Sequence, residues 1–189
     1  NMRCACIDWS NVGYALAELG QLEDAEAILR DMQADAERMG LPMIVGGARQ
    51  NLALALLRLG RYDEAIVAAS GAIEIFSRQA DSRSEGWARQ YLARACLAKG
   101  ELERAETEAR LAVDLMASVP PGLPSALATL AEVHRLQGNL ADARHEARSA
   151  WEVARAAGGV EEGEAWVAAV YADVLDGVGD GEAARTTVV

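Results

Sequence analysis

The sequence has few of the residues that interrupt helices or build sheets. Only four prolines and one phenylalanine occur among 189 residues, and aromatic residues make up 5% of the chain. Valine and isoleucine do not form the alternating runs that are typical of half-buried strands. Apolar residues account for 51%, mostly as alanine and leucine, which favour helices. The composition therefore predicts an all-α protein.

Cysteine is scarce too: the chain has three, Cys4, Cys6 and Cys96. An odd number, with two members one residue apart, excludes a disulfide framework and indicates reduced thiols. No apolar run approaches the roughly 20 residues that a membrane-spanning helix needs. The chain does not open on a signal-peptide pattern. We therefore expect a cytoplasmic protein with no membrane partner.

Positive charge is sparse and dispersed. The chain carries 18 basic and 29 acidic residues, for a net charge of −11. A nucleic-acid surface needs clustered lysine and arginine, so we expect no nucleic-acid partner. Lys99 is the only lysine, and this arginine and alanine bias indicates a bacterial source.

The chain does contain an internal repeat. Asn51–Ala65 (NLALALLRLGRYDEA) has near-copies at Asn11–Ala25, Tyr91–Ala105 and Thr129–Ala143, and a weaker one at Val170–Ala184. Each copy has a turn glycine at its tenth residue: Gly20, Gly60, Gly100, Gly138 and Gly179, spaced by 40, 40, 38 and 41 residues. Self-similarity at a fixed period is typical of a repeat array. Each copy reads as the end of one helix, a turn and the start of a second helix.

Proline, glycine and the first-turn acidic residues place the helix boundaries. We expect first helices near residues 3–19, 42–59, 84–99, 124–137 and 161–176. Second helices should follow near 22–39, 63–79, 103–118 and 141–157. Ser82 or Ser84 is the expected N-cap of the helix that begins at 84.

Small residues recur where the two helices of a hairpin must cross closely. On the first helices they are Gly13, Ala53, Ala93, Ala131 and Ala172; on the second they are Ala25, Ala65, Ala105, Ala143 and Ala184. Larger residues accompany them at two positions: Leu16, Leu56, Cys96, His134 and Leu175 at one, and Leu22, Tyr62, Leu102 and Leu140 at the other. Apolar residues follow each second-helix alanine at helical one-face spacing. Each hairpin should therefore bury one face internally and another against the next hairpin.

This pattern resembles the tetratricopeptide repeat (TPR). Trp9, Val12-Gly13, Leu16, Gly20 and Ala25 match the family's aromatic, Leu-Gly, Tyr, turn Gly and Ala positions. The period of about 40 exceeds the usual 34 and is similar to the subtype in kinesin light chains and bacterial multidomain regulators. HEAT and armadillo repeats share that period and are the structural rival; the turn glycine followed five residues later by alanine favours TPR.

The resemblance implies an all-α, right-handed superhelical solenoid of antiparallel helix hairpins, with about 4.5 repeats. We expect a single array over 1–189, with units near 3–41, 42–82, 83–121, 122–160 and an incomplete 161–189. Both ends look cut, so we expect a fragment of a longer protein.

The resemblance also implies a concave groove lined by the first helices. By register, the candidate peptide-binding residues are Asn11, Tyr14, Gln50, Asn51, Leu54, Arg58, Trp87, Gln90, Tyr91, Arg94, Thr129 and Glu132. Ser10, Ser125, Arg135, Trp166, Asp173 and Asp176 share this register. Amide side chains such as Asn51 both donate and accept, which suits the backbone of an extended peptide. Trp87 and Tyr91, one turn apart, suggest an aromatic platform with Arg94 beside it for a carboxylate.

Catalytic and metal-binding patterns are lacking in the sequence. Cys4 and Cys6 have no second pair or nearby histidine for zinc. His134 occupies a packing position and His145 a second helix, so both read as structural or solvated. No phosphate-cradling loop or nucleophile elbow occurs. We therefore expect no enzyme, no cofactor and no metal.

These features favour a non-catalytic scaffold that binds a peptide or protein segment, as the sensor or docking part of a larger bacterial signalling or transcriptional regulator. Two alternatives stay open. One is a self-association module, in which terminal repeats stack into a homo-oligomer. The other is a sensor for a small ligand or a peptide pheromone.

Overall fold

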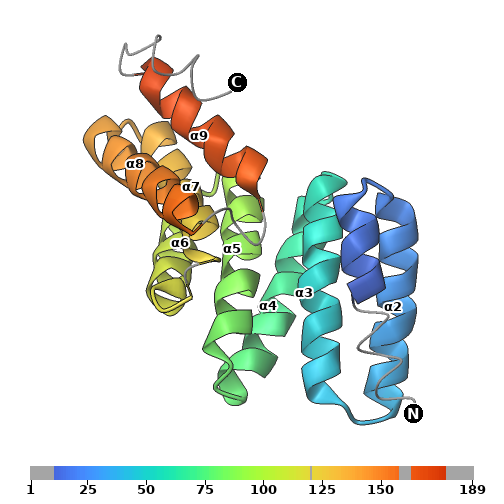
Figure 1. The fold of residues 1–189 in the computed structure, drawn as a ribbon. Coiled ribbons are helices and arrows are strands. Elements are labelled where there is room, and N and C mark those ends of the chain that lie inside the picture. The colour runs from blue at the N-terminus through green and yellow to red at the C-terminus, as the bar shows by residue number, and fades with distance from the viewer. Residues whose placement is uncertain (1–10, 120, 158–162, 178–189) are drawn as a thin grey trace. The chain divides into compact units, whose positions relative to one another are not determined.

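All regular elements in the described part of the chain are helices. The structure, a computed structural model, describes residues 11–119, 121–157 and 163–177. Residues 11–18 are helical and precede eight further helices in this part of the chain (Figure 1): α2 (Leu22–Arg38), α3 (Pro42–Arg58), α4 (Tyr62–Arg78), α5 (Ser82–Ala98), α6 (Leu102–Met116), α7 (Leu123–Leu136), α8 (Leu140–Ala156) and α9 (Glu164–Gly177). The predicted all-α class is confirmed.

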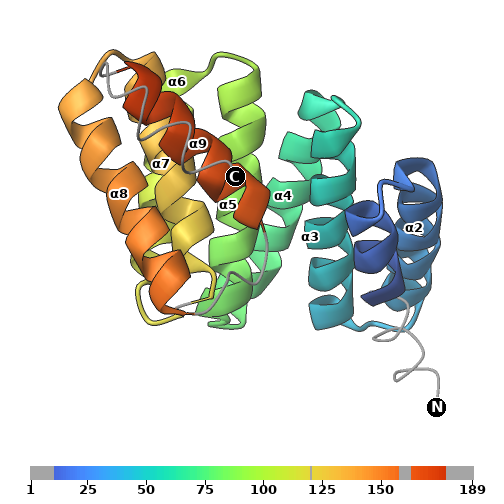
Figure 2. The same ribbon diagram turned by 45° about the horizontal axis from the view of Figure 1, so that its top comes forward.

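The helices pack as successive hairpins within two compact units, Asn1–Lys99 and Gly100–Val189. In the first unit α3 packs against α2, α4 and α5, and α4 also packs against α5. In the second unit α7 packs against α6, α8 and α9, as Figure 2 lets the reader follow. First helices of neighbouring repeats therefore touch each other, as α3 does with α5 and α7 with α9.

The predicted helix boundaries agree with the structure to within about three residues. One capping prediction is wrong, because Asp81, and not Ser82 or Ser84, is the N-cap of α5. The Ser84 backbone N–H donates to the Asp81 carboxylate at 3.1 Å. The negative charge of a carboxylate is also stabilised by the positive end of the helix dipole, and a neutral serine hydroxyl lacks this interaction. Residues 3–10 of the expected first helix lie outside the described residues.

The turn glycines are required by backbone geometry. Gly20, Gly60, Gly100 and Gly138 have φ between 74° and 82°. This left-handed region costs every L-residue energy because of its Cβ. The fifth turn glycine, Gly179, lies outside the described residues.

The small residues lie at the helix crossings, as predicted. Ala53, Ala93 and Ala131 are fully buried. A Cβ added to Gly13 would come within 2.6 Å of the Leu29 side chain, so no larger residue fits there without movement. Ala172 is only half-buried, which differs from the other members.

Each of the second helices α2, α4, α6 and α8 buries one apolar stripe. The members of these stripes are at most 6% exposed: Leu29, Met32, Ala36, Ala69, Ala72, Phe76, Ala109, Ala112, Met116, Ala147, Ala150 and Ala154. The first residue of each of these helices is less buried than expected. Leu22, Tyr62 and Leu102 are half-buried and Leu140 is 41% exposed. These residues stand beside the hairpin turn, where no further turn of helix covers them.

Candidate functional site

Most of the accessible residues of the predicted groove lie on the first helices of the first unit. Asn11 is exposed, while Tyr14, Gln50, Asn51 and Arg94 are half-buried. They come from helix 11–18, α3 and α5, and α3 packs directly against α5. These side chains combine amide, phenol and guanidinium groups, which can hydrogen-bond a peptide backbone and pair with a carboxylate.

Other predicted groove residues of this unit are closed off. Leu54 and Gln90 are fully buried, Tyr91 is 1% exposed and Trp87 is 5% exposed. Trp87 and Tyr91 do contact each other, with ring centroids 6.2 Å apart and planes tilted by 33°. Because both rings are buried, the pair does not form the open aromatic platform that its spacing suggested. Large aromatic surfaces gain more from leaving water than from lying open.

Arg58 ties the first two repeats together. Its Nη1 donates to the backbone carbonyl of Ala17 at 2.6 Å, and its Nη2 pairs with the Glu18 carboxylate. Ala17 lies in the last turn of helix 11–18, where carbonyl groups have no partner within the helix. A cation at this end also complements the helix dipole. Arg58 therefore has a structural role that its register alone did not reveal.

The two predicted groove residues of the second unit differ in accessibility. Thr129 is fully buried, and its hydroxyl donates to the Ser125 backbone carbonyl at 3.0 Å. Glu132 is half-buried and accepts two hydrogen bonds from Arg135, at 2.6 and 2.7 Å. The pKa of Arg135 is raised, first by this bond with Glu132 and further by the nearby charge of Asp173. The negative charge of Glu132 is therefore already paired with Arg135 of the same helix.

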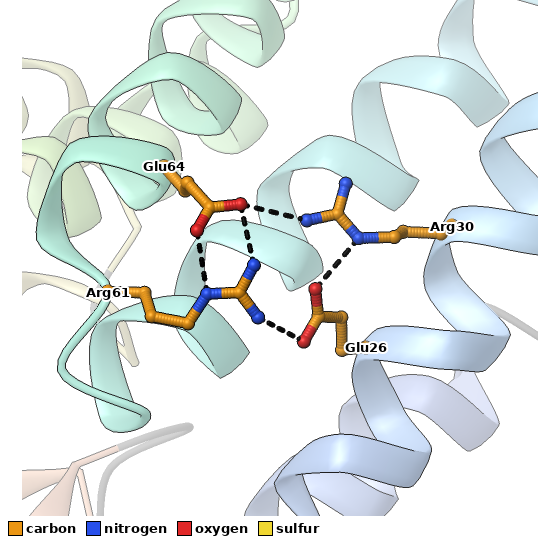
Figure 3. Close-up of polar contacts among 4 residues, drawn as sticks. All are labelled: Glu26, Arg30, Arg61 and Glu64. Carbon is orange, nitrogen blue, oxygen red and sulfur yellow. Dashed lines mark hydrogen bonds and ion pairs between the residues drawn. The ribbon is translucent and has the colours of Figure 1, made fainter.

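A closed ring of four charged residues links α2 to α4 (Figure 3). Arg61 Nη1 donates to Glu26 at 2.6 Å, and Arg30 Nε donates to the same carboxylate at 2.8 Å. Both arginines also bond Glu64, Arg61 through two nitrogens at 2.7 and 2.6 Å and Arg30 at 3.2 Å. The hydrogen bonds between Arg61 and Glu64 lower the pKa of Glu64 and raise the pKa of Arg61. This ring joins the second helices of two neighbouring repeats.

His134 is the centre of a second polar cluster, in the second unit. Its side chain is 3% exposed, and its Nδ1 lies 2.7 Å from Glu146. Its Nε2 lies 3.3 Å from Arg110 and 3.6 Å from Glu106. Nδ1 and the Glu146 carboxylate share a hydrogen bond, while the role of Nε2 depends on the tautomer, because Arg110 can only donate to it and the ionised Glu106 carboxylate can only accept from it. The prediction that His134 occupies a packing position is confirmed.

The two glutamates of this cluster respond in opposite ways. The pKa of Glu146 is raised, chiefly because burial disfavours its charged form. The pKa of Glu106 is lowered, first by a hydrogen bond from Gln137 and then by Arg110 and His134. The repeat pattern does not predict this cluster, since its members come from three helices, α6, α7 and α8. The buried position of His134, which required polar partners, was the one usable signal.

The described ranges contain no group of three or more histidine, cysteine, aspartate or glutamate side chains that could hold a metal ion. Cys96 is buried, while Cys4 and Cys6 lie outside these ranges. Across the same residues, none of the helices has both the length and the apolar character needed to cross a bilayer.

Two family models, both described as tetratricopeptide repeat, match the sequence. One matches residues 47–118, and the other matches residues 11–31 and 124–151. The curated proteins show no sequence match to the chain.

Solved structures share the fold. One holds the nearly identical TPR-like repeats of a protein described as a kinesin light chain from Podosopora anserina. It matches with a TM-score of 0.69 at 18% identity, covering 96% of this chain and 90% of that one. Another is BtubC (BKLC) from P. vanneervenii, with a TM-score of 0.72 at 18% identity over 95% of this chain and 75% of that one. At this identity the likeness concerns the fold alone. The repeat pattern, the helix hairpins and the two family models together show that this chain is a tetratricopeptide repeat protein.

Proposed function

We propose that the chain is a non-catalytic scaffold that binds a peptide or protein segment along the first helices of its repeats. TPR domains in general bind protein partners and are generally non-catalytic. The observation that carries the proposal is the accessible polar face of the first unit, formed by Asn11, Tyr14, Gln50, Asn51 and Arg94. Asparagine recurs at one of these register positions (Asn11 and Asn51) and glutamine at another (Gln50 and Gln90). Other repeats carry different residues there, so the fold does not require these residue types.

The predicted groove residues that are buried pack beneath this face. Leu54 and Tyr91, on α3 and α5, are at most 1% exposed. Rigid packing beneath a binding surface reduces the entropy lost when a ligand is immobilised. Asn51 and Arg94 also form polar interactions within the protein, so a ligand would exchange bonds there rather than fill empty positions.

A peptide selected from a random display library tests this proposal. Its affinity is measured by fluorescence anisotropy for the wild type and for Asn51→Ala combined with Arg94→Ala. Loss of two polar contacts predicts binding weaker by about tenfold or more. Arg38→Ala combined with Arg78→Ala, at exposed positions of α2 and α4, is the matched control and should leave affinity unchanged. Equal affinity of the wild type and the Asn51/Arg94 variant, both folded by circular dichroism, would contradict the proposal.

The finer expectations remain predictions. A bacterial source, a cytoplasmic location and a place in a larger signalling or transcriptional regulator rest on amino-acid composition and on the family resemblance. The single continuous array over 1–189 is likewise a proposal that the repeat register supports.

A further inference from the structure

A groove between α8 and α9 carries an unusual concentration of positive charge. Its volume is about 560 Å³, and its lining includes Arg144, Arg148, Trp151, Arg155 and Tyr171. Glu152 and Leu175 complete the lining. Three arginines therefore face one glutamate, in a protein whose net charge is −11. All these residues belong to the second unit.

Comparison with the other repeats shows that this charge is not required by the fold. Arg144 and Arg155 lie one and twelve residues after the crossing alanine Ala143. The corresponding residues are Glu26 and Glu37 in α2, Ile66 and Ser77 in α4, and Glu106 and Ala117 at and just after α6. Among the four described second helices, α2, α4, α6 and α8, only α8 carries arginine at both positions.

Beside the corresponding groove of the first unit, α2 has an acidic residue where α8 has Arg144. The first unit has an equivalent groove of about 480 Å³, to which α2 contributes Arg30 and Gln33. There Arg30 is neutralised by Glu26 and Glu64, in the ring of Figure 3. In α8 the position of Glu26 is Arg144, so the charge on this position is reversed.

Two of the three arginines are available for a ligand. Arg148 pairs with Glu152 at 2.8 Å, and both side chains are more than half exposed. Arg144 and Arg155 are exposed and form no ion pair with any residue of the described ranges. Exposed guanidinium groups bind carboxylates in a two-pronged geometry.

An apolar contact lies between the arginines. Trp151 and Tyr171 are stacked, with ring centroids 5.5 Å apart and planes 18° from parallel. Both are half-buried and pack on the cluster of Ala147, Val170 and Val174 beneath them. Because the rings already stack on each other, they offer edges and outer surface for an apolar side chain. A nucleic-acid base would find no open slot between them.

We propose that this groove binds an acidic peptide segment of a protein partner. Its carboxylates would pair with Arg144 and Arg155, and an apolar side chain between them would pack on the Trp151–Tyr171 pair. A long polyanion such as nucleic acid would meet repulsion from the acidic remainder of the protein, whereas a short segment is confined to the basic patch. This surface is separate from the first-helix face of the first unit.

A fluorescein-labelled peptide that alternates glutamate with leucine is the probe, and the same peptide with glutamine in place of glutamate is its control. Anisotropy at low and at physiological ionic strength measures both affinities. We expect tighter binding of the acidic peptide, with a difference that shrinks as salt screens the charges. Arg144→Glu combined with Arg155→Glu should weaken acidic-peptide binding by about tenfold.

The matched control is Arg38→Glu combined with Arg78→Glu, which changes net charge equally at exposed positions of α2 and α4. It should change affinity by less than about twofold. Equal binding of the two peptides, or equal loss in both arginine variants, would overturn the proposal. So would a single-stranded oligonucleotide that binds this groove more tightly than the peptide. A dimer in sedimentation that Arg144→Glu with Arg155→Glu dissociates would assign the groove to a second copy instead.

Discussion

Ala80 has a backbone conformation that is unfavourable for an L-residue. It follows the end of α4 and has a φ of 55°, the one positive φ at a non-glycine residue in the described ranges. The equivalent residue after α2 is Gly40, with a φ of 64°. A Cβ in this left-handed region costs about 1–2 kcal/mol. The link between the second and third repeats is therefore strained where the preceding link is not.

We predict that Ala80→Gly raises the free energy of unfolding by about 1 kcal/mol, since removal of Cβ relieves more energy than the added chain entropy costs. Denaturant unfolding followed by circular dichroism measures the change. The control is Ala27→Gly, at an exposed position inside α2, which should lower stability by about 1 kcal/mol. If both substitutions destabilise equally, the strain at Ala80 does not exist.

Polar residues with the same register position also have different roles in different repeats. Asn51 and Tyr91 share one position, yet the first is half-buried and the second is 1% exposed. Arg58 bonds the end of the preceding helix, whereas Leu136 at its position in α7 is 46% exposed. Register thus places a residue on a helix face, and the neighbouring helices decide whether that face is open.

At the scale of the element, two glycines show how closely the helices approach. Gly46 lies in α3, and a Cβ there would come within 2.8 Å of the Phe76 ring, which is 2% exposed. Gly71 lies in α4, and a Cβ there would come within 2.8 Å of the Arg49 guanidinium. The two distances are equal, but a buried ring cannot move as the end of an arginine can.

We predict that Gly46→Ala lowers the free energy of unfolding by about 1–3 kcal/mol, because the packed ring must shift. Gly71→Ala should instead leave stability unchanged or raise it by up to about 1 kcal/mol, through the higher helix propensity of alanine. Thermal and denaturant unfolding of the two variants under identical conditions measures whether each substitution lowers or raises the free energy of unfolding. Destabilisation of similar size in both would show that the flexible Arg49 does not accommodate the methyl group.

At the scale of the whole chain, stability should be distributed by repeat. Contacts in a repeat array join each hairpin to its neighbours, so a local defect has a local effect. Ala53 in α3 and Ala131 in α7 are equivalent crossing residues, and both are fully buried. They belong to different compact units.

We predict that Ala53→Leu, which overpacks its crossing by about 1–3 kcal/mol, speeds amide hydrogen exchange in α2, α3 and α4 more than in α7 and α8. Ala131→Leu should produce the reverse pattern. Mass-spectrometric hydrogen exchange on both variants measures this directly. A uniform loss of protection over all helices in each variant would indicate one cooperative unit and would argue against the prediction.

The sequence by itself determined the repeat architecture. Turn glycines and crossing alanines obey local rules of backbone geometry and close packing, so their period was sufficient to predict helix hairpins and most helix boundaries. Gly20, Gly60, Gly100 and Gly138 share a positive φ, and Ala53, Ala93 and Ala131 are all fully buried at their crossings. The TPR family followed from this pattern.

Only the tertiary structure decided which polar and aromatic residues are accessible. Trp87, Gln90 and Thr129 are closed in by neighbouring helices, while Asn51 and Arg94 remain partly open. The partners of His134 come from α6 and α8, and the groove with Arg144 and Tyr171 comes from α8 and α9. Such contacts depend on how helices distant in sequence pack together, and a repeat period does not encode which side chains they bring into contact.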